Sequence, residues 1–564
     1  MSTASSQDIS PDLVTITFSR RKAEVILQLL VFISGVLLCA HYLRHEFDNP
    51  YSIASDTAQH SYWMVKYHDD DLFKNEFYST YARSLSTPGL EAIYWVGTLV
   101  ASPTRVGKTL AVVIFGFTGW LFFLIGKSIH NHATGFLMLY LWLGFPNHTD
   151  EIDGGLHRAF MFPLLALFVL TLMKRRMDWV PWVMAVALLI YPPALLMMAA
   201  TLVILPIFDW KRVKEMFQSP WAFGGWGALL LAALIVFFVR QLMKPSFLGP
   251  MVTGQEMAED PRFTLGGRST YLPFESLWNT LRVYAFNSNE PMMGFCLLIA
   301  LLIPIRLLQG RRLLREIAPF LALGLASVAL FELAKAIHFR LYIPRRYLQF
   351  SPVIVGAALL AYACATVLPF LRWKWLQGAA IITVCLLIMK DSQGDYQRFF
   401  KDGKYNQRFA ADLFRHLRKE TPKDALIAAD PKFSDAISVF SSRATLLKYE
   451  LSHPWYKAYR AEIEQRARDY YDLVYAESLQ EVRSIRDKYG IDYFIYDPRQ
   501  YNGEDRKRRS MFYQPLRAEL EYKHPLNDPS RSYLMETLAE RVDGFQCDRF
   551  EVIPLDEKTL SQAE

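Results

Sequence analysis

The sequence is poor in cysteine, and its cysteines form none of the patterns of disulfide-rich or zinc-binding proteins. Only five cysteines occur among 564 residues. Four lie in apolar runs and one is alone in the polar C-terminal part: Cys39, Cys296, Cys364, Cys385 and Cys547. Their spacing predicts neither a disulfide framework nor a CxxC metal site.

Long apolar runs are absent from the last third of the chain. Runs of roughly 15–25 residues, long enough to cross a bilayer core of about 30 Å, recur up to Lys390 and then stop. The sequence also shows no internal repeat and no low-complexity tract. The run TRVGKT at 104–109 is not a P-loop, because Ser102 stands where the first glycine belongs and no strand precedes it.

Apolar and aromatic residues are abundant, at 52% and 14% of the chain. Their distribution predicts a polytopic α-helical membrane protein of about 11 transmembrane helices with a soluble C-terminal α/β domain. We expect a cytoplasmic N-terminus at 1–23, a transmembrane domain at 24–390 and the soluble domain at 391–564. The candidate spans are 24–43, 107–126, 133–146, 159–173, 179–191, 193–208, 221–239, 292–308, 317–336, 348–369 and 375–390.

Two segments decide how these spans are counted. The motif YPP at 191–193 divides one long apolar stretch, and because proline breaks helices we expect two short helices there. Residues 89–102 are apolar enough to be a twelfth span, which would invert everything that follows. We interpret them as an interfacial or partly inserted helix.

The positive-inside rule supports that interpretation. It places the basic loops near Lys127, Lys174, Lys211, Arg311 and Arg372 in the cytoplasm, together with the basic N-terminus. The net charge of +7 then reflects topology rather than nucleic-acid binding. The predicted outer loops are 44–106, 147–158, 240–291 and 337–347. The protein is thus expected in the inner (plasma) membrane, in contact with its lipids, with its C-terminal domain on the periplasmic or extracellular side.

The C-terminal part has the pattern of a mixed α/β domain. The segments 425–430, 444–450 and 491–497 are short, strand-like apolar runs, and 455–474 and 477–489 are helical in pattern. Strands that alternate with helices predict a small sheet covered by helices.

The first outer loop carries the first candidate site. Asp56 and His60 are four residues apart, so on a helix they share one face, and such a pair suits general-base catalysis or metal binding. Asp56 could instead cap a helix that begins at Thr57. The acidic run 69–71 is a weaker candidate, since such runs are mostly solvated turns. The many aromatic residues of this loop could dock on a membrane surface.

The second outer loop, TDEIDGGLHRAF, is also acidic. Asp150, Glu151 and Asp153 precede a pair of glycines at 154–155 that allows a close backbone approach, and Arg158 follows. Ionisable residues at a membrane face are candidate functional residues. A plain polar turn could look the same.

Arginines cluster in a third segment, HFRLYIPRRY. Arg340, Arg345 and Arg346 fall on the outer face against the positive-inside rule, beside Tyr347. Guanidinium groups bind phosphate through paired hydrogen bonds, so we interpret the cluster as a site for a lipid-linked phosphate. Anchoring to anionic lipid head groups is the alternative. Arg268, in the loop 240–291, could reach the same anion.

This layout resembles the GT-C class of membrane glycosyltransferases. The similarity lies in one span, a large first outer loop with an aspartate (Asp56), a second acidic loop two spans later (150–153), many further spans and an outer C-terminal domain. The resemblance implies inverting transfer of a sugar from a polyprenyl phosphate or pyrophosphate donor to a glycan, lipid or protein. It also implies that a first-loop carboxylate is the base or a cation ligand.

On this basis the predicted site has three parts. Asp56, His60 and Asp153 are expected to be catalytic. The substrate-binding residues are expected to be Arg158, Arg268, Arg340, Arg345, Arg346 and Tyr347. A divalent cation is an open question, with Asp56, Asp150, Glu151 and Asp153 as its potential ligands.

The sequence also departs from relatives in this class. The Asp-Glu pair of the mannosyltransferases is missing, since Thr57 follows Asp56, and no WWDYG motif of oligosaccharyltransferases appears. A polymerase or ligase that uses the same lipid donor remains an alternative, as does a transporter of lipid-linked saccharide. A receptor or scaffold would leave the acidic loops unexplained.

Overall fold

The computed structural model describes most of the chain. The described residues are 11–74, 76–143, 149–269, 276–286, 311–337, 341, 343–367, 406–501, 511–525 and 532–563, with 373, 375–376, 378–379 and 383. Arg340, the predicted span 292–308 and most of the predicted span 375–390 lie outside these ranges.

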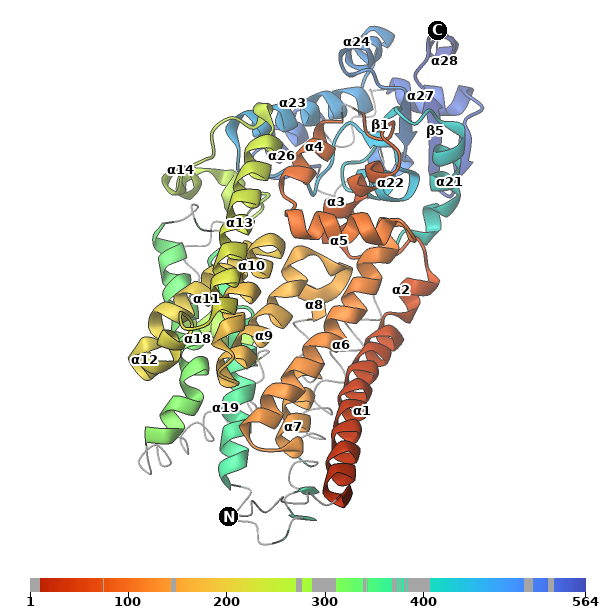
Figure 1. Ribbon diagram of the computed structural model, residues 1–564. Coiled ribbons are helices and arrows are strands. Elements are labelled where there is room, and N and C mark those ends of the chain that lie inside the picture. Colours follow the sequence, from red (N-terminus) through yellow and green to blue (C-terminus); the bar gives the residue numbers. More distant parts are fainter. Residues whose placement is uncertain are drawn as a thin grey trace, which may run out of the picture.

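Apolar helices form an elongated bundle that carries the C-terminal domain at one end (Figure 1). The bundle helices include α1 (Pro11–Tyr42), α6 (Pro103–Ile129), α7 (His132–Leu143), α9 (Met161–Met173), α10 (Val180–Ile190), α11 (Pro192–Ile204), α13 (Pro220–Met243), α18 (Arg311–Ala336) and α19 (Ser351–Val367). Their facing sides share one large apolar core. The N-terminal end of α1 lies at the end of the bundle opposite the C-terminal domain.

Among the described residues, five segments are long and apolar enough to cross a membrane: Arg21–Tyr42, Pro103–Ile129, Pro220–Arg240, Leu314–Ala336 and Pro344–Ala365. A sixth arises if α11 and α12 (Pro206–Glu215), bent by 106° at their junction, count as one span. Three predicted spans correspond to shorter apolar helices, of 10–17 residues. The chain is thus an integral membrane protein, and the predicted number of about 11 spans stays a prediction.

The two ambiguous segments adopt short helices. α10 ends at Ile190 and α11 begins at Pro192, with Tyr191 extended between them, so the division predicted from YPP is confirmed. The segment 89–102, which could have been a twelfth span, forms α5 (Pro88–Thr98), a helix of 11 residues. At 1.5 Å per residue it is about 16 Å long, roughly half of the bilayer core.

In the C-terminal domain the described residues form a five-stranded sheet in the order β2-β1-β3-β5-β4. The strand β1 (Leu426–Ala428) runs parallel to β2 (Ala444–Thr445) and to the central strand β3 (Tyr493–Tyr496). β5 (Phe550–Pro554) pairs antiparallel with β3 and with the edge strand β4 (Phe545–Cys547). The packing helices are α21 (Ala411–Glu420), α22 (Ser434–Ser441), α23 (Lys457–Val474), α24 (Leu479–Tyr489), α26 (Leu516–Lys523), α27 (Leu534–Arg541) and α28 (Glu557–Leu560).

Each of the three predicted strand segments contains a strand, but two details differ. The segment 444–450 is a strand only at Ala444–Thr445, because the chain then turns inward and Tyr449 N–H bonds to the Pro431 carbonyl (3.0 Å). The antiparallel pair β4 and β5 was not predicted. Its strands are short and are separated by two residues, so the alternation of apolar and polar residues that indicates a strand is weak there.

The first outer loop is folded between the bundle and the C-terminal domain. It consists of α2 (Arg44–Asp48), α3 (Ser55–Ser61), η1 (Tyr62–Tyr67) and α4 (Phe77–Ser84), followed by α5 (Figure 1). Several of its aromatic side chains pack inside the protein, and their expected docking on a membrane surface stays a prediction. Trp63, Tyr78 and Tyr81 are at most 2% exposed, and the Tyr81 ring lies 4.1 Å from that of Tyr459 in α23. Burial of these rings fixes the loop against the C-terminal domain.

A buried ion pair reinforces this contact. The Lys448 ammonium lies 3.4 Å from a carboxylate oxygen of Glu76, and the two side chains are 0% and 2% exposed. Tyr62 donates a hydrogen bond to the other oxygen of Glu76 (2.9 Å), and its ring lies 4.2 Å from the ammonium. The partners stand in the first loop and in the C-terminal domain, so this ion pair joins the two segments.

Candidate functional site

Asp56 is presented at the start of a short helix. α3 begins at Ser55 and its N-cap is Ala54, with no side-chain cap, so the alternative in which Asp56 caps a helix beginning at Thr57 is wrong. Asp56 instead lies in the first turn, where a helix favours negative charge. Its carboxylate is 37% exposed and forms an ion pair with Arg158 (2.5 Å).

The second acidic loop reaches Asp56 because of its two glycines. This loop comprises α8 (Thr149–Ile152), η3 (Asp153–Gly155) and η4 (His157–Phe160). Gly154 and Gly155 have φ of 75° and 62°, values that favour glycine. A Cβ on Gly154 would stand 1.6 Å from Thr57 Oγ1, and one on Gly155 would stand 2.6 Å from the Gly107 carbonyl oxygen. The glycines therefore pack this loop directly against α3 and α6.

Four charged side chains form a continuous network at this junction. Arg158 lies between Asp56 and Glu151, with its Nε 3.1 Å from a Glu151 oxygen. Arg346, in η8 (Pro344–Tyr347), donates to the same Glu151 oxygen (2.7 Å) and to Gln349 (3.1 Å). Gln349 in turn donates to the other oxygen of Glu151. The network joins the first loop, the second acidic loop and the arginine segment. These are the three segments whose acidic and arginine residues the sequence indicated as candidate site residues.

The two arginines of η8 differ in their surroundings. Arg346 is neutralised by Glu151, whereas Arg345 is half-buried and its side chain has no ion pair or hydrogen bond to any described residue. Tyr347, predicted to bind substrate, is 1% exposed and belongs to the core of the bundle.

The surroundings of Asp153 include Glu46 and Lys108. The charge of Asp153 acts on both, and Lys108 donates to the backbone carbonyls of Glu46 and Asn49. Glu151 is the carboxylate that contacts both Arg158 and Arg346. Of Asp150 only the backbone is described.

The electrostatics of the site keep its carboxylates ionised. Burial would raise the pKa of Asp56, but the charge of Arg158, together with its hydrogen bond and the charge of Arg346, outweighs burial and holds the pKa below the ordinary value. The pKa of Glu151 is lowered in the same way, by Arg158 and Arg346 against the effect of burial. Burial lowers the pKa of His60 to about 4 against the opposing charge of Asp56. At neutral pH His60 is thus uncharged, and its ring meets that of His157 edge-on, with centroids 6.2 Å apart.

The C-terminal domain touches the site through Gln59. The Gln59 amide donates to Asp56 (3.4 Å) and to Glu450 (3.2 Å). Arg268, expected to bind substrate, bonds instead to the Glu450 carboxylate (2.8 Å) and the Tyr449 carbonyl (3.0 Å). Sequence reasoning missed Gln59, Glu450 and Gln349. Two of them had a usable signal, because Gln59 stands three residues after Asp56 and Gln349 three residues after Arg346.

No group of three or more histidine, cysteine, aspartate or glutamate side chains that could hold a metal ion occurs among the described residues. In the network, Arg158 occupies the space between the Asp56 and Glu151 carboxylates. These residues as arranged do not fit a cation unless Arg158 moves. The acidic run 69–71 lies elsewhere, and Asp69 pairs with Lys423 (2.7 Å).

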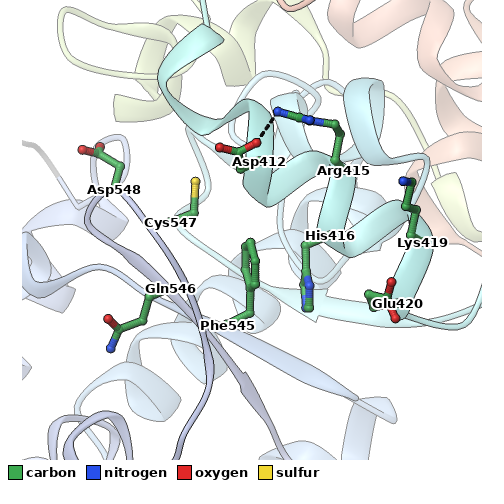
Figure 2. A pocket seen from close by; sticks show the side chains of 9 residues that line it. All are labelled: Asp412, Arg415, His416, Lys419, Glu420, Phe545, Gln546, Cys547 and Asp548. Atoms are coloured by element: carbon green, nitrogen blue, oxygen red, sulfur yellow. Dashed lines mark hydrogen bonds and ion pairs between the residues drawn. The ribbon is translucent and has the colours of Figure 1, made fainter.

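Two hollows open on the C-terminal domain away from Asp56. Figure 2 shows one of about 520 Å³, where α21 faces the edge strand β4 and the His416 ring lies flat on Phe545, with centroids 3.8 Å apart. The other, of about 280 Å³, lies beyond the ends of β1 and β3. Neither is lined by residues of the charged network.

Comparison with known proteins identifies the fold. No protein-family model matches the sequence, and no curated protein matches it either. The oligosaccharyltransferase of Archaeoglobus fulgidus in its apo form aligns with a TM-score of 0.52 at 11% identity, over 95% of this chain and 77% of that chain. Its complex with Zn and sulfate aligns with a TM-score of 0.50 at 12% identity, over 87% and 70% of the two chains.

ArnT from Cupriavidus metallidurans in the apo state aligns over 96% of this chain and 99% of that chain, at 12% identity and a TM-score of 0.49. At such identities a likeness concerns the fold. The chain has the fold of the GT-C class of membrane glycosyltransferases, the class that its sequence resembles.

Proposed function

We propose that this protein transfers a sugar from a polyprenyl phosphate or pyrophosphate donor to an acceptor on the outer face of the membrane. The observation that carries the proposal is the juxtaposition of an accessible carboxylate, Asp56, with an arginine network at the membrane end of the C-terminal domain. The oligosaccharyltransferase fold supports the same class of reaction.

The charges of the site suit a phosphate. The carboxylates of Asp56 and Glu151 balance the guanidinium groups of Arg158 and Arg346, so this network has a formal charge of zero. Arg345 adds one positive charge with no counter-ion among the described residues. A lipid-linked phosphate would supply that counter-ion, and the planar guanidinium group binds it in paired hydrogen bonds. Arg340 would extend the same site.

The reaction assigns a task to each group. The acceptor oxygen forms a bond to the anomeric carbon of the sugar, and the bond from that carbon to the phosphate oxygen of the donor breaks. Its electron pair leaves with the lipid phosphate, and the proton of the acceptor hydroxyl passes to Asp56. Arg345 stabilises the charge that develops on the leaving phosphate. Attack from the face opposite the leaving group inverts the anomeric centre.

Asp56 is a weak base while it is bound to Arg158, because that contact lowers its pKa. Release of Arg158 would raise the pKa of Asp56 and strengthen the base. His60 is uncharged at neutral pH and could hold the acceptor hydroxyl by a hydrogen bond. A divalent cation bound between Asp56 and Glu151 would have to displace Arg158, so we assign no step to one.

The catalytic assignment can be tested by following the release of lipid phosphate, which does not depend on the acceptor. Purified protein in proteoliposomes is given a panel of undecaprenyl-phosphate-linked sugars with a cell-envelope extract as acceptor. Asp56→Asn should lower the release by about 10²–10⁴-fold, the usual worth of a positioned base. Asp69→Asn, at a carboxylate that pairs with Lys423 and is not part of the network, is the matched control. Undiminished release by Asp56→Asn at normal expression would refute the assignment.

The phosphate site can be tested by binding alone. Arg345→Ala should weaken binding of undecaprenyl phosphate to the purified protein roughly tenfold or more, the loss expected for a charge-assisted hydrogen bond. Arg345→Lys should retain part of it. Arg415→Ala, on the surface of the C-terminal domain, is the control. Equal affinity of Arg345→Ala and the unaltered protein would exclude this arginine from the site.

A further inference from the structure

A short helix turns aside at the end of the bundle that lies away from the charged network. α11 begins beside the second acidic loop, where the rings of Tyr191 and His157 lie 5.3 Å apart, and it ends at Ile204. α12 then leaves α11 at an angle of 106°. Figure 1 shows α12 at the edge of the bundle, away from the C-terminal domain. Because α11 belongs to the membrane-crossing bundle, a helix bent from it by this angle lies nearly in the membrane plane.

The outward face of α12 combines a tryptophan with lysines. Trp210, Lys211 and Lys214 follow one another at the spacing of one helix face and are exposed, Trp210 to 65%. The opposite face, with Asp209 and Arg212, is buried against the bundle, and Arg212 donates to a backbone carbonyl at the start of α18 (3.2 Å). Tryptophan and lysine on one exposed face are typical of helices that lie between water and lipid.

Further tryptophans lie at the same end of the bundle. Trp221, in the first turn of α13, packs against Trp179 and Trp182, with ring centroids 5.6 Å and 5.0 Å apart. Trp179 and Trp221 are both more than 40% exposed. Tryptophan rings gather at the level of the lipid head groups, because one part of the ring is apolar and the N–H group is polar. The cluster therefore supports a position of α12 at that level.

The segments 174–178 and 209–215 carry an excess of positive charge. They contain six cations and three carboxylates, which gives a formal charge of +3. Each carboxylate is already bound by an arginine: Asp178 by Arg176 (3.2 Å), Asp209 by Arg212 (3.4 Å) and Glu215 by Arg175 (3.3 Å). The contact between Arg175 and Glu215 joins the two segments into one surface.

The other three cations are lysines, and all three are exposed. The side chains of Lys174, Lys211 and Lys214 have no ion pair or hydrogen bond to any described residue. The adjoining start of α18 does not cancel their charge, because Arg315 and Glu316 have opposite charges. These lysines are therefore the cations of this surface that an anionic partner would neutralise.

We propose that α12 lies flat on the membrane and binds anionic phospholipids through Lys174, Lys211 and Lys214. The lipid phosphates meet the ammonium groups, and the Trp210 ring enters the boundary between head groups and acyl chains. The predicted topology places this end of the bundle at the cytoplasmic leaflet, whose anionic lipids attract basic segments. A water-soluble acidic partner would leave the exposed tryptophans without a role. This surface is separate from the proposed transfer site and does not depend on it.

Native mass spectrometry of the full-length protein in detergent micelles tests the proposal. The probes are phosphatidylglycerol and phosphatidylcholine with identical acyl chains, titrated separately. Phosphatidylglycerol should bind at least about fivefold more tightly, the usual worth of one lysine near a membrane surface. Equal binding of the two lipids would leave this face to a water-soluble partner and overturn the proposal.

Variants localise the binding. Lys214→Gln should weaken binding of phosphatidylglycerol about fivefold, and the triple variant Lys174→Gln/Lys211→Gln/Lys214→Gln should weaken it roughly tenfold or more. Binding of phosphatidylcholine should stay unchanged in both. The triple variant should also keep the unfolding midpoint of the unaltered protein, because it removes no contact between described residues.

A matched control removes the same charge elsewhere. It replaces three exposed lysines of the C-terminal domain: Lys419→Gln/Lys523→Gln/Lys558→Gln. This control should bind phosphatidylglycerol as the unaltered protein does. Undiminished binding by the first triple variant, or an equal loss in the control, would overturn the proposal.

Discussion

Replacement of Lys448 by methionine should loosen the attachment of the first loop to the C-terminal domain. The variant keeps most of the side-chain volume but removes the cation that faces Glu76 at 3.4 Å. A carboxylate left without its partner in a buried site costs about 3–5 kcal/mol. The variant can also remove the buried charge by taking up a proton, and the cost of that uptake is an upper bound on the loss of stability. Protonating a free glutamate at pH 7 costs about 3.7 kcal/mol, or 2.7 pH units at about 1.36 kcal/mol each.

The expected loss is thus about 3–4 kcal/mol at pH 7. At pH 5 it shrinks to about 1 kcal/mol, since protonation then costs less. At about 2–4 °C per kcal/mol for a domain of this size, the midpoint of thermal unfolding should fall by roughly 6–15 °C at pH 7. Tryptophan fluorescence at a fixed heating rate measures it, because Trp63 is buried in the same interface.

The double variant Lys448→Met/Glu76→Gln separates the ion pair from other effects. It leaves no buried charge at either position, so it should recover to within about 1 kcal/mol of the unaltered protein. A single variant that melts within about 2 °C of the unaltered protein at pH 7 would refute the reasoning. A double variant as unstable as the single one would do so too, because the loss would then come from packing.

Three further predictions concern the charged groups and the close backbone contact. Burial raises the pKa of Asp435 to about 7 from 3.8, so this group removes stability as pH rises from about 4 to 7, and Asp435→Asn should raise the unfolding midpoint at pH 8 but not at pH 4. Arg158→Gln removes the largest charge that lowers the pKa of Asp56, so the acid limb of the pH–rate profile for lipid-phosphate release should move to higher pH; an unmoved limb would exclude Asp56 as the base. Gly154→Ala puts a Cβ 1.6 Å from Thr57 Oγ1, so it should disrupt the site, and added Thr57→Ala should restore part of the lipid-phosphate release; equal defects in both variants would contradict this packing.

The sequence predicted the kinds of residues in the site better than their contacts. Apolar runs predict membrane spans because the thickness of the bilayer sets the length of a spanning helix. YPP predicts a helix break because proline lacks a backbone N–H group. The acidic and arginine loops were recognised because ionisable residues at a membrane face are unusual. Nothing in sequence spacing, however, pairs Asp56 with Arg158, 102 positions later, or favours Glu151 over Asp153 as its neighbour.

Lys448 illustrates the opposite case. It stands in a strand-like run, ATLLKYE, where a lysine should face solvent, yet it is fully buried. A lysine within an apolar run indicates a buried acidic partner. That partner, Glu76, lies among many acidic residues of the first loop, so the pair could be found only when the fold brought the two segments together.

Because of its long-range contacts, the first loop can reach its final structure only after the C-terminal domain has been synthesised. Asn49 bonds to Asn406, Tyr81 to His453 and Gln59 to Glu450, at separations of 357, 372 and 391 residues. At about 5–20 residues per second, a ribosome needs roughly 20–80 s to synthesise the partners after the loop has emerged. During that interval the loop exposes its aromatic side chains and its glutamate with nothing to bury them. A nascent chain that stops before residue 406 can therefore insert its helices while its first loop stays unfolded, a state that quality-control proteases would recognise.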